Sequence, residues 1–292
     1  MQRPSLAQLQ TLAEVAGSGS FLAAAGRLGL TQPAVSLRIR ELEQALGVRL
    51  IERVGRKATP TTAGRILVGY VKQIDATLDE ALRSLAEQSG SVSGQVRLGT
   101  GATACIYLLP PVLRAVKSRY PLIDIAVHTG NSGETLKALQ ANELDVAVVT
   151  LPAPGRGFSV KVLIEEEMVA AFAADALPAE KVTPDFLARQ SMILLYEPAG
   201  NSRRVIDEWF RAGGELARPG MELGNIEAIK KMVGAGLGLS IIPRMAADDD
   251  GLAVKSLTPR LHRRIGMVLR RDKVPDAALR AVIKALAGLA AS

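Results

Sequence analysis

The stretch SFLAAAGRLGLTQPAVSLRIRELEQAL, residues 20–46, decides how the N-terminal part of the chain folds. It predicts two helices joined by a tight turn at residues 28–30. Ser20 and Thr31 are suited to cap them, because a hydroxyl at a helix start accepts a hydrogen bond from an otherwise unpaired amide. Pro33 falls in the first turn of the second helix, where a missing N–H costs little.

The second of these helices has one apolar and one polar face. Its apolar residues recur at a 4-3-4 spacing, which places them on one side: Val35, Ile39, Leu42 and Leu46. Another sector is polar, is cationic at its edge and holds no acid: Gln32, Pro33, Ser36, Leu37 and Arg40. Such a face suits the major groove of DNA. The alternative is a surface helical hairpin whose polar side is merely solvated.

The residues that follow, VRLIERVGRKATPT (48–61), predict a small β-hairpin around Gly55. Two short apolar pieces flank the glycine, and cations, among them Arg53 and Arg56, lie close by. Cations on a hairpin beside a helix-turn-helix can reach phosphates or the minor groove. The hairpin is therefore interpreted as the wing of a DNA-binding domain.

Residues 31–64, TQPAVSLRIRELEQALGVRLIERVGRKATPTTAG, resemble the N-terminal signature of LysR-type transcriptional regulators. The resemblance implies sequence-specific binding to double-stranded promoter DNA, with RNA polymerase as a further partner. The sequence departs from the family pattern after Ser36, where Leu37 stands in place of a common Arg and Arg38 in place of a common Gln. The predicted DNA-binding residues are Gln32, Pro33, Ser36, Leu37, Arg38, Arg40, Arg53 and Arg56.

Composition supports a nucleic-acid partner for this segment. The chain has 292 residues and a net charge of +7, and residues 1–65 contribute nine basic against four acidic side chains. Such asymmetry indicates that the N-terminal part binds the nucleic acid.

An apolar content of 48% is enough for hydrophobic cores, and no apolar run approaches the ~18 residues of a membrane span. The N-terminus lacks the apolar region of a signal peptide, so the expected location is the cytoplasm, with no membrane partner.

Residues 61–88 predict a long helix with a coiled-coil seam. Apolar residues follow a heptad spacing, and the residues expected to pair two chains are Leu67, Val71, Ile74, Leu78 and Leu85. The alternative is a helix packed on its own domain. The family resemblance favours a linker helix that joins a homodimer, and it implies a homotetramer through the C-terminal domains. Residues 89–94, SGSVSG, are interpreted as a hinge.

From Gln95 onward the pattern becomes an alternation of strands and helices. QVRLG (95–99), IDIAVHT (123–129) and DVAVVT (145–150) read as strands, with helices expected at 108–120 and 134–141. This rhythm predicts a parallel sheet with helices on its faces. A second run comprises MVAAFA (168–173), MILLYE (192–197), helices at 203–212 and 226–235, and LSIIP (239–243). RIGMVLR (264–270) and a terminal helix at 277–289 close the chain.

The predicted fold class is therefore α/β with an N-terminal, all-α winged helix-turn-helix. The C-terminal half resembles a two-lobed periplasmic-binding-protein fold, and the LysR resemblance extends loosely to it through LLPPVL, SRYP, ELDVAVV and GAGLGLSIIP. The expected domains are a winged helix-turn-helix at 1–60, a linker helix and hinge at 61–91, and an effector-binding domain at 92–292. Its lobe I comprises 92–165 and 266–292, and its lobe II comprises 166–265.

Ligands of open α/β sheets bind beyond the carboxyl ends of strands, next to helix N-termini. Four such junctions are rich in glycine, hydroxyls and amides, at 99–103, 129–132, 200–202 and 224–225. Exposed backbone amides there favour an anion. The resemblance places an effector at the same junctions, and the predicted ligand is a small anion. The predicted effector residues are Thr100, Ala102, Thr103, Thr129, Thr150, Asn201, Ser202 and Asn225.

Two other functions remain to be weighed against a regulator. A solute-binding receptor is disfavoured by the winged helix, and an enzyme by the lack of a nucleophile–base pair or carboxylate pair near those junctions. The sequence suggests no catalytic residue, no cofactor and no metal cluster, since it holds two distant histidines and one cysteine. Cys105 follows the first junction, where a lone cysteine is typically buried filler rather than a sensor.

Overall fold

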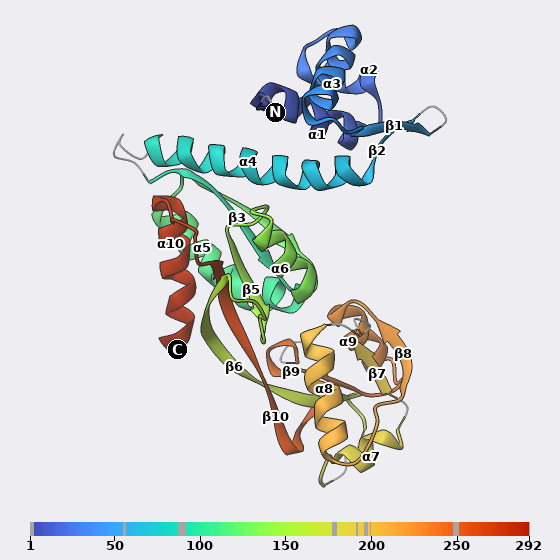
Figure 1. Ribbon diagram of the computed structural model, residues 1–292. Helices are drawn as coiled ribbons and strands as arrows, with labels where there is room; N and C mark the ends of the chain where they lie inside the picture. The colour runs from blue at the N-terminus through green and yellow to red at the C-terminus, as the bar shows by residue number, and fades with distance from the viewer. Residues whose placement is uncertain are drawn as a thin grey trace. The chain divides into compact units, whose positions relative to one another are not determined.

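The computed structural model describes residues 3–54, 57–86, 92–176, 180–190, 192–195, 198, 200–247 and 251–291. Within these ranges the side chains of 53–54, 79–86, 192–195 and 291 are not described. The chain divides into two compact units, residues 1–82 with 141–143 and residues 83–140 with 144–292. Each unit is treated by itself below (Figure 1).

The first unit is a three-helix domain with a two-stranded wing. Its elements are α1 (Leu6–Ser18), α2 (Phe21–Leu28), α3 (Gln32–Leu46), β1 (Ile51–Val54) and β2 (Lys57–Pro60). β1 and β2 pair antiparallel, with Ile51 opposite Pro60. The core is aliphatic and joins all three helices to the wing, with Leu12, Val35 and Leu42 fully buried.

Local hydrogen bonds explain where these helices begin. Ser20 accepts from the amide of Ala23 and Thr31 from that of Ala34, so both predicted caps are confirmed. The helix α1 runs past Gly17. It continues to Ser18, and Gly19 closes it in the left-handed conformation at φ 66°, with its amide donating to the carbonyl of Val15.

The helix α4 (Thr62–Ala86) follows the wing, and Thr61 caps it by accepting from the amide of Gly64 at 3.0 Å. Gly64 is required for this junction, since an added Cβ would lie 2.0 Å from the carbonyl oxygen of Leu50. The helix was predicted to extend to Gln88, which lies outside the described residues.

The second unit is built on a six-stranded mixed sheet in the order β4-β3-β5-β10-β6-β9. The strands are β3 (Gly94–Thr100), β4 (Ile123–Thr129), β5 (Val146–Thr150), β6 (Phe158–Phe172), β9 (Ser240–Pro243) and β10 (Ala253–Arg270). β3 pairs parallel with β4 and β5, as the sequence predicted. β10 and β6 run antiparallel to each other, and β9 is antiparallel to β6.

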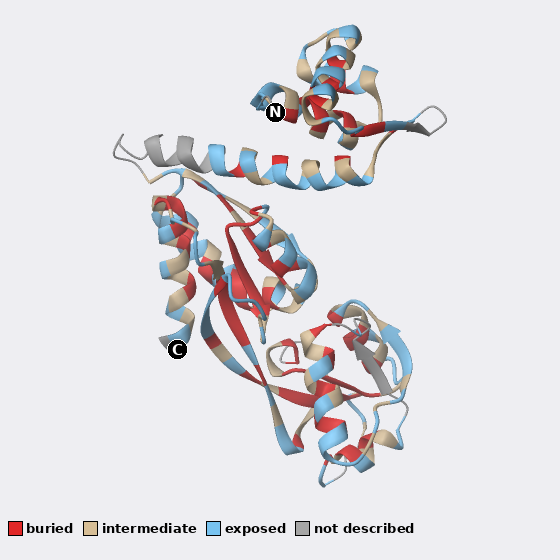
Figure 2. Ribbon diagram, in the orientation of Figure 1, coloured by how far each residue is buried: buried red, intermediate tan, exposed pale blue. Residues whose placement is uncertain are grey.

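Helices cover this sheet. A smaller parallel sheet, β7 (Met192–Leu195) with β8 (Pro219–Leu223), is not hydrogen-bonded to it. The helices are α5 (Leu109–Arg119), α6 (Ser132–Gln140), α7 (Pro184–Ala188), α8 (Asn201–Ala212), α9 (Ile226–Gly234) and α10 (Ala277–Ala287). A π-helix at Ala104–Leu108 precedes α5, and the sequence did not predict this π-helix. Figure 2 shows the buried middle of the sheet and the exposed outer faces of α8 and α10.

Two strands are far longer than predicted. The strand expected at 168–173 begins at Phe158, and the strand expected at 264–270 begins at Ala253. Their register shifts between Ser256 and Leu261, where the Thr258–Pro259 bond is cis. β6 and β10 thus run through both lobes side by side, so the expected lobe boundaries at 165/166 and 265/266 fall inside continuous strands (Figure 1).

A buried ion cluster joins three segments of lobe I. The carboxylate of Asp145 accepts from the backbone amide of Arg97 at 2.8 Å, from its guanidinium Nε and Nη2 at 3.1 and 2.9 Å, and from Lys273 Nζ at 2.9 Å. Only 4% of the side chains of Asp145 and Lys273 is exposed. Burial by itself raises the pKa of Asp145, but the bonds from Arg97 and the charge of Lys273 outweigh it and lower the pKa to about 2.

Candidate functional site

The first candidate site is the outward face of α3. Val35, Ile39 and Leu42 are buried, which leaves the opposite face open. Gln32 Nε2 donates to Ser36 Oγ at 3.1 Å, so these two residues lie one turn apart on the same face. Leu37 and Arg40 are exposed, and Pro33 lies exposed in the first turn. This row of side chains matches the sector that the sequence proposed for base contacts.

Other predicted DNA-binding residues are placed differently or are not described. Arg38 is half-buried and its Nη1 lies 3.5 Å from Thr11 Oγ1 on α1, so its head is turned toward the domain rather than along the open face. The side chains of Arg53 and Arg56 lie outside the described part of the chain. The wing that carries them is held to α3 by Glu43, whose carboxylate accepts from the amides of Leu50 and Ile51 at 2.7 and 3.1 Å.

The predicted seam on α4 is only partly available to a partner. Val71 is fully buried and Leu67 is half-buried, and both pack into the core of their own domain. For these two residues the alternative interpretation, a helix packed on its own domain, describes the structure. Ile74 and Leu78 are exposed, and Leu85 lies outside the described side chains.

Two further exposed residues extend this surface, Ile66 and Tyr70, at 60% and 59% exposure. Together with Ile74 and Leu78 they recur every fourth residue, which on a helix makes one apolar strip. We call Ile66, Tyr70, Ile74 and Leu78 the α4 strip.

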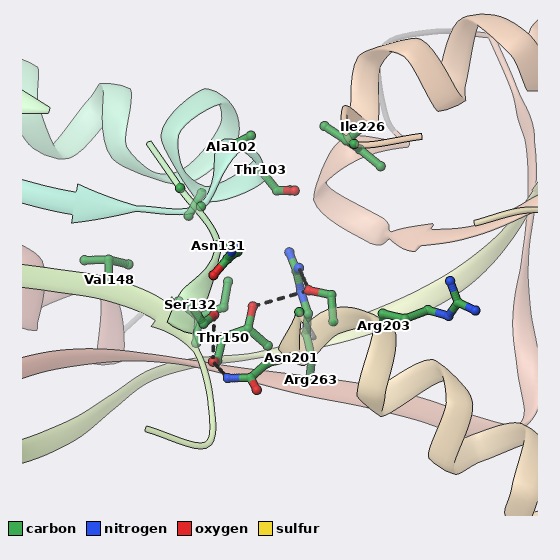
Figure 3. A pocket seen from close by; sticks show the side chains of 17 residues that line it. Ala102, Thr103, Asn131, Ser132, Val148, Thr150, Asn201, Arg203, Ile226 and Arg263 are labelled. Carbon is green, nitrogen blue, oxygen red and sulfur yellow. Dashed lines mark hydrogen bonds between the residues drawn. The ribbon is translucent and has the colours of Figure 1, made fainter. Parts of the chain in front are cut away.

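The second candidate site is a cavity between the two lobes, of about 80 Å³ (Figure 3). Residues from the ends of β3, β4 and β5 meet the N-termini of α8 and α9 there, as expected for ligand sites in open α/β sheets. The lining residues are Gly101, Ala102, Thr103, Ala104, Gly130, Asn131, Ser132, Val148, Thr150, Gly200, Asn201, Ser202, Arg203, Gly224, Ile226, Arg263 and Ile265.

Five of the eight predicted effector residues line this cavity: Ala102, Thr103, Thr150, Asn201 and Ser202. The other three do not. Thr100 is fully buried and its hydroxyl donates to the carbonyl of Val148 at 3.0 Å, so it ties β3 to β5. Thr129 is exposed outside the cavity, and Asn225 caps α9 by accepting from the amides of Glu227 and Ala228. Thr100 and Asn225 therefore stabilise the elements around the cavity rather than line it.

Asn201 lies at the cavity, but its amide nitrogen is engaged. Nδ2 donates to the carbonyl of Thr150 at 2.5 Å and to that of Pro152 at 2.8 Å. Because Asn201 belongs to lobe II and its acceptors to lobe I, this side chain bridges the lobes. Thr150 Oγ1 and Ser202 Oγ lie 3.5 Å apart across the same gap.

Arg263 is the lining residue that matters most and that sequence reasoning missed. It sits on β10 and is 4% exposed, yet its guanidinium reaches the cavity (Figure 3). A signal existed in the sequence: Leu261, Arg263, Ile265 and Met267 alternate at the period of a strand, so Arg263 occupies an inward position of β10.

Glu166 on β6 balances the charge of Arg263. Arg263 Nε donates to Glu166 Oε2 at 2.8 Å, and Nη1 donates to Ser202 Oγ at 3.0 Å. Nη2 lies 2.7 Å from the same Glu166 oxygen, but the angle does not make a hydrogen bond, and this buried nitrogen has no other hydrogen-bond partner. The other oxygen of Glu166 accepts from the amide of Met245 at 3.3 Å. The cavity wall therefore contains a fixed cation whose charge is balanced by Glu166.

The second arginine at the cavity is directed elsewhere. Arg203 Nε donates to Asp207 at 2.9 Å and Nη1 to Glu222 at 3.2 Å, and Figure 3 shows its guanidinium pointing away from the other labelled residues. No carboxylate is among the lining residues, so a bound anion would meet Arg263 without direct repulsion from the cavity wall. Thr103 and Asn131 add polar groups from lobe I.

Beside the cavity, a second polar cluster crosses between the lobes. Tyr107 of lobe I donates its hydroxyl proton to Glu227, and Lys230 donates to the Tyr107 hydroxyl, both from α9 of lobe II. Burial, followed by the bond to Glu227, raises the pKa of Tyr107, so this phenol keeps its proton at neutral pH.

Within the described residues, no group of three or more His, Cys, Asp or Glu side chains is arranged to hold a metal ion. Among the helices that the structure describes, none is long and apolar enough to span a bilayer. Cys105 is a half-buried free thiol in the π-helix.

Taken together, a winged helix-turn-helix and a two-lobed domain with a ligand-sized cavity define a DNA-binding regulator with an effector domain. The comparisons give the family. The helix-turn-helix domain of the lysR family, described as a bacterial regulatory protein, matches residues 6–65, and the LysR substrate binding domain matches residues 89–291. The chain belongs to the LysR family of transcriptional regulators, which are DNA-binding proteins rather than enzymes.

Curated relatives cover most of the chain. An uncharacterized HTH-type transcriptional regulator, YfeR of Shigella flexneri, is 30% identical over 92% of this chain and 89% of its own length. The HTH-type transcriptional regulator CbbR of Rhodospirillum rubrum is 33% identical over 82% of this chain and 79% of its own. Full-length CbnR, solved in complex with its target DNA, is 22% identical and covers 98% of this chain and 99% of that one, with a TM-score of 0.73, which supports the fold.

Proposed function

We propose that this regulator responds to a small anion bound between the lobes of its C-terminal domain. The observation that carries the proposal is Arg263, a buried cation that lines the cavity and donates from Nη1 to the hydroxyl of Ser202, another lining residue. A guanidinium matches the geometry of carboxylates and other oxyanions, and a bond to a charged acceptor is stronger than one to a neutral acceptor. Ser202, already bonded to Arg263, supplies a hydroxyl next to the same position.

The volume of the cavity restricts the size of the ligand. A water-sized atom needs about 10–15 Å³ of such space, so about 80 Å³ accommodates roughly five to eight non-hydrogen atoms. Small dicarboxylates, hydroxy acids and inorganic oxyanions fall in this range.

A titration of the full-length protein tests this proposal. Malonate, lactate and sulfate are compared with the neutral analogue malonamide and with the larger anions benzoate and citrate, using calorimetry. We expect at least one compact anion to bind, and the neutral analogue to bind at least about tenfold more weakly, because it lacks the charge that Arg263 recognises. Equal binding of malonate and malonamide would contradict the anionic assignment, and preferred binding of benzoate or citrate would contradict the size.

We further propose that the open face of α3 reads bases in the major groove. Gln32 is suited to bond both donor and acceptor of an adenine, with Ser36 beside it and Leu37 near a thymine methyl. Gln32→Ala should cost about 1–3 kcal/mol on the specific operator and little on random DNA. Gln44→Ala, near the C-terminal end of the same helix, is the control. Equal losses on both DNA sequences would remove Gln32 from base readout.

Arg40, exposed beside this row, is proposed to contact phosphate. Each neutralised phosphate adds about −0.9 to the slope of log affinity against log salt. Arg40→Gln should therefore flatten that slope by about one unit, on specific and random DNA alike. Arg53 and Arg56 on the wing are proposed for the same role.

Two chains are proposed to pair through the α4 strip. A carboxylate placed in an apolar interface is costly when it has no partner, so Ile74→Asp should convert the dimer to monomer and abolish tight operator binding. Lys72→Asp, on the opposite side of the helix, is the control. Sedimentation measures the oligomeric state of the Ile74→Asp and Lys72→Asp proteins. A dimeric Ile74→Asp protein with full operator affinity would contradict this interface.

Two further associations complete the proposal. Two dimers form a tetramer through the effector domains, and the regulator acts on RNA polymerase.

A further inference from the structure

The cluster of Tyr107, Glu227 and Lys230 connects the two lobes, and none of the three residues lines the cavity. The Tyr107 hydroxyl donates to a carboxylate oxygen of Glu227 and accepts from Lys230 Nζ. Lys230 Nζ is also 3.3 Å from both carboxylate oxygens of Glu227 and 4.9 Å from the centroid of the Tyr107 ring. One side chain of lobe I thus contacts lobe II by two hydrogen bonds and a cation–π contact.

These contacts matter because Lys230 is buried. Only 2% of its side chain is exposed, and a buried ammonium is costly unless hydrogen bonds and opposite charge compensate it. The Tyr107 ring packs against an apolar cluster of lobe II that includes Val169, Ile226 and Ile229. If the lobes separate, Lys230 loses a hydroxyl and an aromatic face together, and apolar surface of lobe II meets water.

The backbone ties this cluster to the cavity on both sides. The π-helix Ala104–Leu108 carries Tyr107 and directly follows Gly101, Ala102 and Thr103, which line the cavity. On the other lobe, Ile226 lines the cavity and Glu227 is its neighbour in α9. Short π-helical segments are rare and frequently mark functional sites. A movement of either segment therefore changes the cavity and the cluster at once.

We propose that Tyr107, Glu227 and Lys230 form a latch that holds the two lobes closed and thereby sets effector affinity from outside the cavity. This inference rests on the proposed effector site. β6 and β10, which are continuous through both lobes, are the connection about which the lobes open. The apparent affinity of a ligand that requires the closed form is its intrinsic affinity multiplied by the fraction of closed molecules, so a weaker latch lowers affinity without removing any ligand contact.

Hydrogen exchange in the ligand-free, full-length protein tests the latch itself. Tyr107→Phe removes the hydroxyl and keeps the ring, and Tyr120→Phe, a half-buried tyrosine of the lobe I core, is the matched control. We expect amides of 104–108 and 226–234 to exchange about tenfold faster in Tyr107→Phe, the effect of losing a hydrogen bond to a charged group. Tyr120→Phe should leave both segments unchanged. Wild-type exchange in Tyr107→Phe would overturn the latch.

A double-mutant cycle separates a latch from two unrelated structural roles. Lys230→Met removes the ammonium and keeps the length of the side chain. Tyr107 still bonds Glu227 in that variant, so Tyr107→Phe/Lys230→Met should exchange faster than Lys230→Met, but by less than the two single effects combined. Glu227→Gln serves the same purpose if Lys230→Met does not fold. Additive effects would show that the residues act independently and would overturn the proposal.

The effect on ligand binding is measured with malonate, lactate and sulfate. Whichever of them binds the wild type should bind Tyr107→Phe about tenfold more weakly, the change expected if the open fraction becomes dominant. Unchanged affinity would show that the cluster does not control the cavity. If none of the three anions binds the wild type, the anionic-effector proposal fails, and the exchange experiment still decides the latch by itself.

Discussion

Two buried clusters of the C-terminal domain both pair a carboxylate with an arginine, but they differ in what surrounds the charges. At one, Asp145 accepts four hydrogen bonds from Arg97 and Lys273. At the other, Arg263 is paired with Glu166 and bonded to Ser202, but one buried nitrogen of its guanidinium makes no hydrogen bond. The first cluster joins β3 to the segments before β5 and after β10, whereas the second faces a cavity.

The difference between them lies in how completely the charges are satisfied. A buried ion whose bonds are all made within the protein supports the fold and has little left for a ligand. A buried ion that also lines a cavity can meet a charged ligand there, where low polarity strengthens the interaction. The Asp145 cluster is therefore interpreted as structural and the Arg263 cluster as a recognition site. The following predictions test that distinction, from the largest effect on free energy to the smallest.

The largest effect is expected when one partner of the structural cluster is removed. Asp145→Asn leaves Lys273 and Arg97 with uncompensated buried charge, which costs about 3–5 kcal/mol of unfolding free energy. Asp124→Asn is the control, because Asp124 is exposed and lies 4.0 Å from Lys117. Urea unfolding measures the unfolding free energy of both variants. A loss below about 1 kcal/mol at Asp145, the range of a surface pair, would show that this cluster is not what holds the three segments together.

The second prediction concerns acid. Asp145 has a pKa of about 2 in the folded protein against an ordinary value of 3.8. Because the folded value is depressed, the stabilisation is complete above pH 3.8 and is lost as the pH falls toward 2, and it amounts to about 2 kcal/mol. Unfolding free energies measured across this window should fall less steeply in Asp145→Asn than in the wild type. Parallel curves for the two proteins would contradict the shifted pKa.

The contrast between the clusters also shows what the sequence could and could not predict. The caps at Ser20 and Thr31 and the buried face of α3 were predicted correctly, because helix periodicity and capping act between residues close in the chain. The four polar junctions were predicted near one another because parallel strands end at one edge. Which side chain faces the cavity depends on pairing between strands that are distant in the chain. The pairing of β6 with β10, across about a hundred residues, placed Arg263 in the site, and the bond from Thr100 to Val148 on β5 turned Thr100 away.

The same reason explains the strands that were predicted too short. β6 and β10 carry charged residues in their middle, such as Glu166 and Arg263, which read as the end of an apolar run. Paired across the two strands, these charges neutralise each other and the strands continue. The seam on α4 shows the converse, since heptad spacing identified an apolar side but did not show that Val71 is occupied by its own domain.

The third prediction separates recognition from stability. Glu166→Gln/Arg263→Gln removes both charges and retains polar side chains, so the unfolding free energy should change by less than about 1 kcal/mol, since removing both partners of a buried pair is often neutral. Binding of the compact anion should weaken at least about tenfold, which is 1.4 kcal/mol. Arg204→Gln/Glu208→Gln, an exposed pair on α8, is the control. Retained anion binding in the Glu166/Arg263 variant would mean that another group recognises the charge.

The smallest effect is expected at Ser202, whose hydroxyl accepts from Arg263 Nη1 and lies near Thr150. Ser202→Ala removes one neutral hydrogen-bonding group and leaves the Arg263–Glu166 pair in place, so anion affinity should fall by about threefold to tenfold, the range for a single such bond. Ser132→Ala is the matched control, because Ser132 also lines the cavity but bonds the carbonyl of Thr150 within lobe I. The anion affinity of Ser132→Ala should stay within about twofold of the wild type if the anion is held on the lobe II side. That is a change of about 0.4 kcal/mol, typical of a substitution that removes no ligand contact. Calorimetry with the same anion ranks the two variants. A larger loss at Ser132 than at Ser202 would place the charged group of the effector on lobe I, against the helix N-terminus of α6, and would leave Arg263 as a structural ion like those around Asp145.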